Sequence, residues 1–302
     1  MSKPSDHGKG RVAGIRKDAV DARDLEFDAR DFEESKDLRR YLFDVENQKA
    51  SEGCAGFAMS TILEMWLKRD HPARAVELSP LFAWWNARFM EGEAGENQPV
   101  TARSALKALL HHGICPESTW KFDESKWFLR PSRAAFRTAK HYRITAYRRC
   151  RSVEAIKSAI SQELPVFLGM ELREGFANIS GSLETHPRQF VGYRRNPKTG
   201  GHFMALVGYR HEGAIVVNSW GTDFHDQGCV LIPWDVLVED QYDVWVVTGL
   251  EVRKPRRTTG KASRPWKGAP AGRARKPEPP KKAVRSRKRT PAGSRSAPSR
   301  RP

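Results

Sequence analysis

The sequence has few cysteines, no long apolar run and no apolar segment near its start. Its four cysteines are Cys54, Cys115, Cys150 and Cys229. If one thiol must stay free, the other three allow one disulfide at most. No run of about eighteen apolar residues is present, so no transmembrane segment is predicted, and the first residues do not lead into the apolar core of a signal peptide. We therefore expect a cytoplasmic, reducing environment.

Acidic residues are scarce only in the C-terminal part of the chain. Lys and Arg total 53 against 36 Asp and Glu, which gives a net charge of +17. Residues 252–302 hold 19 basic residues and one acidic residue, Glu278, so their net charge is +18 and residues 1–251 carry −1. This balance argues against a basic nucleic-acid-binding domain within residues 1–251.

Residues 251–302 are dominated by Arg, Lys, Pro, Ser, Gly and Ala, with Trp266 as their one aromatic residue. Such a segment buries too little apolar surface to fold, so a disordered tail is predicted. The tail would bind nucleic acid, another acidic partner or a membrane surface without sequence specificity. A purely solubilising role for its charge is an equal alternative.

The rest of the chain divides into a polar leader, a helical part and a strand-rich part. We expect residues 1–36 to form a flexible or extended leader that packs along the domain, and residues 37–250 to form one domain with an α+β fold. Its helical lobe spans about residues 37–140 and its antiparallel β lobe about residues 141–250. Helices are predicted over residues 57–69, 81–89, 102–112 and 153–162, and strands over residues 142–147, 165–170, 228–232 and 243–250.

The stretch from Asn47 to Ala58 is predicted to be a nucleophile loop that leads into a helix, since apolar residues follow from Phe57 at helical spacing. Cys54 then lies at the helix start, where free backbone N–H groups and the helix dipole favour a thiolate. The side-chain amide of Gln48 would reach the point where an oxyanion forms beside the Cys54 N–H.

Two further residues complete a candidate constellation. His202 and Asn218 lie in short apolar runs separated by a turn-like segment at residues 210–213. A β-hairpin there would bring Asn218 back near His202. Histidine can accept the thiol proton, and an asparagine oxygen can hold its ring in one tautomer.

These residues resemble the papain-like cysteine peptidases, in the order Cys54, His202, Asn218, with Gln48 as oxyanion donor. The segments that carry the resemblance are 218–222 (NSWGT), 78–82 (LSPLF) and 106–120, the last typical of bacterial members. The resemblance covers about residues 37–250 and implies a papain-like two-lobe fold, with a helical lobe and a β-barrel-like lobe. It also implies an acyl-enzyme mechanism and substrate contacts at Gly201, Phe203 and Trp220.

The sequence departs from the family pattern at three places. Ser51 stands in the neighbourhood of a usual cysteine, Ala55 replaces a usual aromatic residue after the nucleophile, and Phe203 follows the histidine where a small residue is usual. About forty residues precede Gln48, so we expect no long inhibitory pro-segment. No cofactor or metal is expected. Two groups of potential zinc ligands occur, His111 with His112 and Cys115, and His225 with Cys229, but neither has a second pair of ligands at the spacing usual for a zinc site.

Three functions follow from this constellation. The first is a cysteine-type peptidase acting on a peptide or protein substrate. The second is a catalytically weak papain-like binding or adaptor protein that acts through the basic tail. The third is an acyl or amide transferase, in which an amine instead of water intercepts the same acyl-enzyme.

Overall fold

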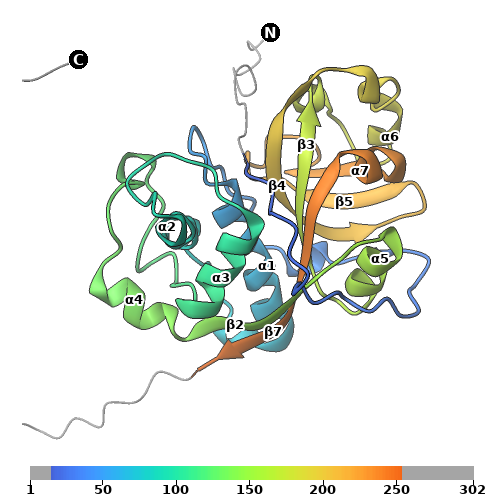
Figure 1. Cartoon of the computed structure of the whole chain (residues 1–302). Helices are drawn as coiled ribbons and strands as arrows, with labels where there is room; N and C mark the ends of the chain where they lie inside the picture. Colours follow the sequence, from blue (N-terminus) through green and yellow to red (C-terminus); the bar gives the residue numbers. More distant parts are fainter. Residues whose placement is uncertain (1–14, 254–302) are drawn as a thin grey trace, which may run out of the picture. The chain divides into compact units, whose positions relative to one another are not determined.

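The computed structural model describes residues 15–253 (Figure 1). Helices cluster in the first half of this range, and short helical turns connect the later strands. The α-helices are α1 (Cys54–Asp70), α2 (Pro80–Glu91), α3 (Ala102–His111), α4 (Arg133–Ala139), α5 (Val153–Ser161), α6 (His186–Gln189) and α7 (Trp234–Asp240). The 3-10 turns are η1 (Arg39–Tyr41), η2 (Pro72–Arg74), η3 (Glu124–Lys126), η4 (Phe176–Asn178) and η5 (Tyr193–Arg195).

The strands form one antiparallel sheet in the order β2-β7-β3-β4-β5-β6, with β1 paired to β4. They are β1 (Lys36–Asp37), β2 (Tyr142–Arg149), β3 (Val166–Arg173), β4 (Lys198–Tyr209), β5 (Gly213–Val217), β6 (Cys229–Pro233) and β7 (Gln241–Val252). The predicted α+β fold class, with helices before an antiparallel sheet, is confirmed. The expected hairpin at residues 210–213 joins β4 to β5.

Helix α1 is the central element of the helical part (Figure 1). It packs against α2 on one side and against strand β4 on the other. A Cβ on Gly56 would collide with the Pro80 carbonyl and the Trp84 side chain, so only glycine allows α1 and α2 to approach this closely. This close packing fixes the start of α1, and with it Cys54, against β4.

Helix α2 begins with a capping serine and a proline. Ser79 caps it by accepting a hydrogen bond from the Phe82 N–H at 3.1 Å, and Pro80 occupies the first turn. Gly92 ends it in the left-handed conformation, with φ of 82°. The loop that follows therefore leaves α2 at Glu91, whose carboxylate points back to the Thr101 N–H at 2.9 Å.

The leader is attached along the sheet at several points. The Phe27 N–H donates to the Arg149 carbonyl at 2.9 Å, and the Arg149 N–H donates to the Leu25 carbonyl at 2.8 Å. Further on, β1 pairs with β4 through Lys36 and Asp37. These bonds hold residues 25–37 against the domain.

The segment between β3 and β4 contains η4, α6 and η5 as short ordered turns. Of the predicted tail 251–302, only the first three residues are described; the remainder, like residues 1–14, lies outside the described residues. Within residues 15–253, no helix has the length and apolar character needed to traverse a bilayer.

Candidate active site

Cys54 is the first residue of α1 and is 1% exposed. Its N-cap, Gly53, offers no side-chain acceptor, so the first N–H groups of the helix are not satisfied by a cap. The thiol sulfur lies within hydrogen-bonding reach of its own N–H, of the Ala55 N–H and of the Phe203 N–H on β4. Cys54 therefore contacts the strand that carries His202.

His202 and Asn218 are joined directly. His202 Nε2 and Asn218 Oδ1 are 2.9 Å apart, and both residues are buried. Asn218 Oδ1 also accepts the Ser219 N–H at 2.7 Å, which fixes the amide so that its oxygen faces the ring. This contact defines His202 Nε2 as the protonated nitrogen, because an amide oxygen only accepts hydrogen bonds.

Trp220 covers this histidine. The centroids of the Trp220 and His202 rings are 5.2 Å apart with an interplanar angle of 35°. Trp220 in turn packs edge-on against Phe224 at 4.5 Å. The His202–Asn218 hydrogen bond is thus shielded from water by an aromatic cluster, which strengthens it.

Gln48 lies in the loop before Cys54 and is buried. Its side-chain Nε2 donates to the Ser51 carbonyl at 2.8 Å, and its Oε1 accepts from the Ser219 hydroxyl at 2.5 Å. Its backbone N–H donates to the Ser219 carbonyl at 2.8 Å. Ser51, which stands in the neighbourhood of the family's second cysteine, donates its hydroxyl to the Gln48 carbonyl at 2.8 Å and so helps to fix the loop.

The electrostatics of Cys54 differ from the sequence expectation. Burial raises the pKa of the Cys54 thiol to about 12, and the nearby Glu52 carboxylate acts in the same direction. The backbone N–H groups around the sulfur lower the pKa, as expected at a helix start, but burial outweighs them. In this closed arrangement the thiol form is favoured.

The two remaining predicted contacts lie on β4 beside His202. The Phe203 side chain, expected to line a substrate pocket, is instead fully buried and stacks on Phe167 at 4.5 Å. Side chains alternate along a strand, so His202 and Phe203 face opposite sides, and Phe203 contributes its backbone N–H to the site. Gly201 is a buried glycine of β4, and it lies close to two residues that were not predicted from the sequence.

These missed residues are Ile15 and Tyr242. A Cβ on Gly201 would collide with the Tyr242 hydroxyl and with the Ile15 side chain. The Tyr242 hydroxyl is buried and has no hydrogen-bond partner among residues 15–253. Burial raises the pKa of Tyr242, and negative charge on Cys54 acts in the same direction.

A separate cavity of about 660 Å³ lies between the segment around α6 and η5 and helix α7. Its lining includes Pro187, Val191, Arg194, Pro233 and Glu239. None of the predicted site residues line it, so it is not the place where a peptide would meet Cys54.

Comparison with known sequences gives one family. The family model described as papain family cysteine protease matches residues 26–236. An uncharacterized peptidase C1-like protein of Acanthamoeba polyphaga mimivirus is 24% identical over 195 residues, which cover 59% of this chain and 61% of that protein. A cathepsin B-like cysteine proteinase of Ostertagia ostertagi is 29% identical over 98 residues, 31% of this chain and 52% of that protein. The chain thus spans between about half and three fifths of the length of these curated relatives.

Solved structures agree on the fold. Xylellain, a cysteine protease from Xylella fastidiosa, superposes with a TM-score of 0.69 at 21% identity, over 80% of this chain and 97% of that one. Procathepsin B from Trypanosoma congolense gives a TM-score of 0.60 at 12% identity, over 80% and 87% of the two chains. At such identities the similarity establishes the two-lobe architecture alone.

Proposed function

Because the chain belongs to the papain family of cysteine proteases, we propose that it hydrolyses peptide bonds through an acyl-enzyme formed on Cys54. One observation carries this proposal: the buried hydrogen bond of 2.9 Å between His202 and Asn218. His202 lies on β4, and the N–H of the next residue, Phe203, faces the Cys54 sulfur. A histidine held in one tautomer beside a thiol is the arrangement that activates a cysteine nucleophile.

In the proposed reaction, His202 Nδ1 takes the thiol proton, and the Asn218 oxygen keeps the resulting imidazolium in place. The thiolate attacks the peptide carbonyl carbon, and the carbonyl electrons move to oxygen. The Cys54 N–H and Gln48 Nε2 stabilise this oxyanion. One N–H of Gln48 already binds the Ser51 carbonyl, so the second is the donor to the substrate.

The intermediate then collapses. The C–N bond breaks as His202 donates its proton to the leaving amine, and a thioester remains on Cys54. A water molecule, deprotonated by His202, attacks the thioester carbonyl. The C–S bond breaks, the carboxylic acid product leaves, and the thiol regains its proton.

The test is hydrolysis of a mixed fluorogenic peptide pool by the full chain. We expect Cys54→Ala and His202→Ala each to lower kcat/KM by about 10³-fold or more, since residues of one catalytic unit fail together. His111→Ala, an exposed histidine in the last turn of α3, is the matched control and should retain activity. Equal activity of His202→Ala and His111→Ala would refute the proposed role of His202.

Two other functions are compatible with the same residues but gain no specific support. An adaptor would bind partners through residues 252–302 without turnover, and a transferase would pass the acyl group to an amine. Product analysis with and without added amines separates them: a free carboxylate supports hydrolysis, a new amide supports transfer, and an unchanged peptide supports the adaptor.

A further inference from the structure

Four exposed apolar side chains gather at one end of the helical part. They form two pairs: Phe89 and Met90 at the end of α2, and Phe128 and Leu129 in the loop before α4. These side chains are 38% to 54% exposed, so they project into solvent and do not fill the core. Arg88 joins the two pairs, because its Nη2 donates to the Trp127 carbonyl at 2.6 Å.

Ring contacts connect the apolar pairs to α4. The rings of Phe89 and His112 lie 6.5 Å apart, and those of His112 and Phe136 lie 6.0 Å apart. The Arg130 guanidinium lies 5.9 Å from the centroid of the Phe136 ring. Figure 1 shows α4 beside α2 and α3. The end of α2, the loop before α4 and α4 itself therefore form one continuous surface.

Helix α4 presents a stripe of cations on this surface. Arg133, Arg137 and Lys140 are exposed and follow one another at spacings of four and three residues, so they lie on one face of the helix. Ala135 and Ala139 are buried on the opposite side. Like charges at such spacings destabilise a helix, so the stripe is not explained by the stability of α4.

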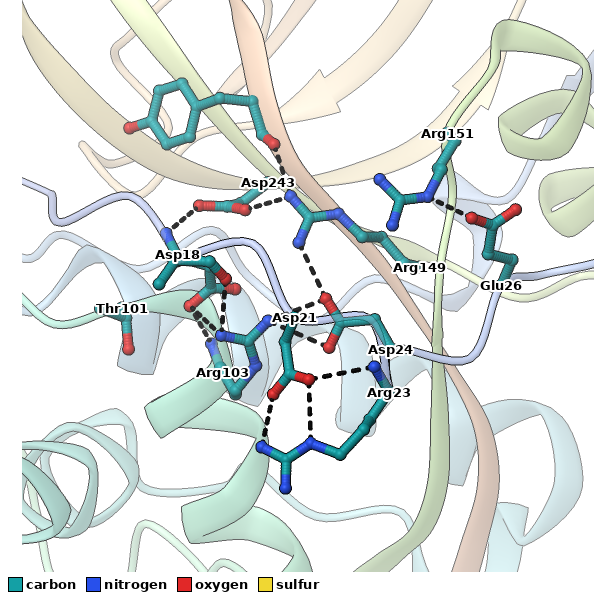
Figure 2. Close-up of polar contacts among 12 residues, drawn as sticks. Asp18, Asp21, Arg23, Asp24, Glu26, Thr101, Arg103, Arg149, Arg151 and Asp243 are labelled. Atoms are coloured by element: carbon teal, nitrogen blue, oxygen red, sulfur yellow. Dashed lines mark hydrogen bonds and ion pairs between the residues drawn. The ribbon is translucent and has the colours of Figure 1, made fainter.

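The fold neutralises other cations of the same segment but not these. Residues 125–153 hold nine Lys and Arg and no Asp or Glu. Carboxylates of the leader and of β7 bind Arg149 and Arg151, as Figure 2 shows. The part of the chain that the structure describes supplies no ion-pair partner to four others: Arg130, Arg133, Arg137 and Lys140. Their charge is therefore available to a partner.

Acidic side chains close to this surface are few. Asp123 is paired with Lys126 at 2.8 Å, and Glu91 at the end of α2 accepts hydrogen bonds from Thr101. Glu124 in η3 is exposed. One exposed carboxylate does not balance four unpaired cations, so the surface attracts anions.

We propose that this surface binds an anionic lipid bilayer. We call it the basic apolar face; it consists of the two apolar pairs together with Arg130, Arg133, Arg137 and Lys140. The apolar side chains enter the boundary between headgroups and acyl chains, and the cations pair with the anionic headgroups. The face includes no residue of the proposed mechanism, so this binding is independent of the peptidase activity.

Three observations favour a bilayer over a soluble polyanion. Met90 and Leu129 are aliphatic and cannot stack on nucleic-acid bases, whereas hydrocarbon accepts them. Half-exposed side chains that project from two segments suit insertion into a lipid surface better than they suit a groove for a peptide. The net charge of +18 on residues 252–302 supplies a second attraction to the same anionic lipids, and stable membrane association needs two such signals.

The face also leaves the proposed active site free. Pro80, at the start of α2, packs against Gly56 near the start of α1. Phe89 lies nine residues further along α2, which is about 14 Å along a helix axis. A bilayer bound at the end of α2 therefore does not need to cover Cys54.

The first experiment places an environment-sensitive nitrobenzoxadiazole label on Phe128→Cys in the full chain. The four native cysteines are buried, so the label reacts at position 128. We expect its emission to rise and shift to shorter wavelength with vesicles of phosphatidylserine and phosphatidylcholine, but not with phosphatidylcholine alone. The same label on Val191→Cys, an exposed position on the β lobe, is the control and should report water in both cases. Attachment by the tail alone would not distinguish the two positions.

The second experiment adds Arg133→Glu/Arg137→Glu to the chain labelled at position 128. The emission change should disappear, and the affinity for anionic vesicles should fall by about tenfold or more. Arg188→Glu/Arg195→Glu is the matched control. It makes the same charge change at two exposed arginines of the β lobe that also have no ion-pair partner among residues 15–253, and it should keep the emission change. Arg133→Gln/Arg137→Gln serves as a milder variant if charge reversal prevents folding.

Several outcomes would overturn the proposal. One is an unchanged emission at position 128 on anionic vesicles, and another is an equal emission change in both double variants. A response at position 128 to double-stranded DNA or to polyglutamate, without a response to vesicles, would assign the face to a soluble polyanion instead. A response that grows with protein concentration in the absence of vesicles would assign it to a second copy of this chain.

Discussion

At the scale of the residue, the Gln48 side chain is held at both ends of its amide. The Ser51 carbonyl holds its amide nitrogen, and the Ser219 hydroxyl holds its amide oxygen. Ser219 follows Asn218, so one short segment orients both the histidine partner and the proposed oxyanion donor. This coupling makes Gln48 a preorganised dipole, which is the property that stabilises developing charge.

We expect Gln48→Ala to lower kcat for peptide hydrolysis by about 10²-fold. Alkylation of Cys54 by iodoacetamide creates no oxyanion, so its rate should change little in the same variant. Comparing the two rates separates a loss of oxyanion stabilisation from a change in the accessibility of the Cys54 thiol. A parallel fall in both rates would mean that Gln48 maintains the loop and does not stabilise the oxyanion.

At the scale of the element, helix α1 carries a buried carboxyl group as well as the nucleophile. Burial raises the pKa of Glu64 in α1 to about 8 and that of Glu46, in the loop before it, to about 9. Burial also raises the pKa of Glu117, and the acidic neighbours act on each other in the same direction. Glu46 and Glu64 are therefore protonated in the folded protein at neutral pH.

The consequence for stability follows from the direction of the shift. A carboxyl group whose pKa is higher in the fold than in the unfolded chain binds more protons when folded. Its contribution to the free energy of unfolding is complete below the ordinary pKa near 4.5 and is lost as the pH rises through about 8 to 9. The folded protein should therefore be less stable at pH 8 than at pH 5 by this term.

Glu46→Gln tests this dependence, because glutamine keeps the shape and never ionises. We expect the variant to gain on the order of 2–4 kcal/mol relative to the parent at pH 8, and little at pH 4, measured by urea unfolding. Glu124→Gln, an exposed position in η3, is the control and should follow the parent at both pH values. A gain of the same size at both pH values would contradict the proposed ionisation.

At the scale of the whole molecule, the charge is unevenly divided between the domain and the tail. Residues 255–302 hold 17 basic residues and Glu278, so removing them would leave a chain with a net charge of +1. Binding to a polyanion would depend on this segment and would be weakened by salt. The peptidase chemistry proposed above uses no residue of the tail.

Deletion of residues 255–302 should therefore abolish retention on double-stranded DNA at low salt while leaving hydrolysis of short peptides unchanged. For the full chain, we expect affinity to fall by at least about tenfold between about 50 and 200 mM salt. The deletion begins after β7 so that the pairing of β7 with β2 is kept. DNA retention by the shortened chain would show that the domain, and not the tail, binds nucleic acid.

Much of the fold could be predicted because its signals are local. The helix that begins at Cys54 and the hairpin between β4 and β5 each follow from periodicity or turn composition within a few residues. The candidate residues His202 and Asn218 could be paired for the same reason, since a short hairpin connects their strands. The role of Gln48 follows from the resemblance and remains a prediction.

The rest depends on contacts between distant parts of the chain. Nothing near Ile15 in sequence indicates that it lies against Gly201 and Tyr242, and the alternation that turns Phe203 into the core appears only once β3 and β4 are paired. The helix start predicted a low pKa for Cys54, but burial reverses the direction. Sequence thus determined the chemistry that this protein carries, because side-chain type and spacing are local properties. Tertiary structure alone decided whether that chemistry is accessible, because burial is a property of the assembled chain.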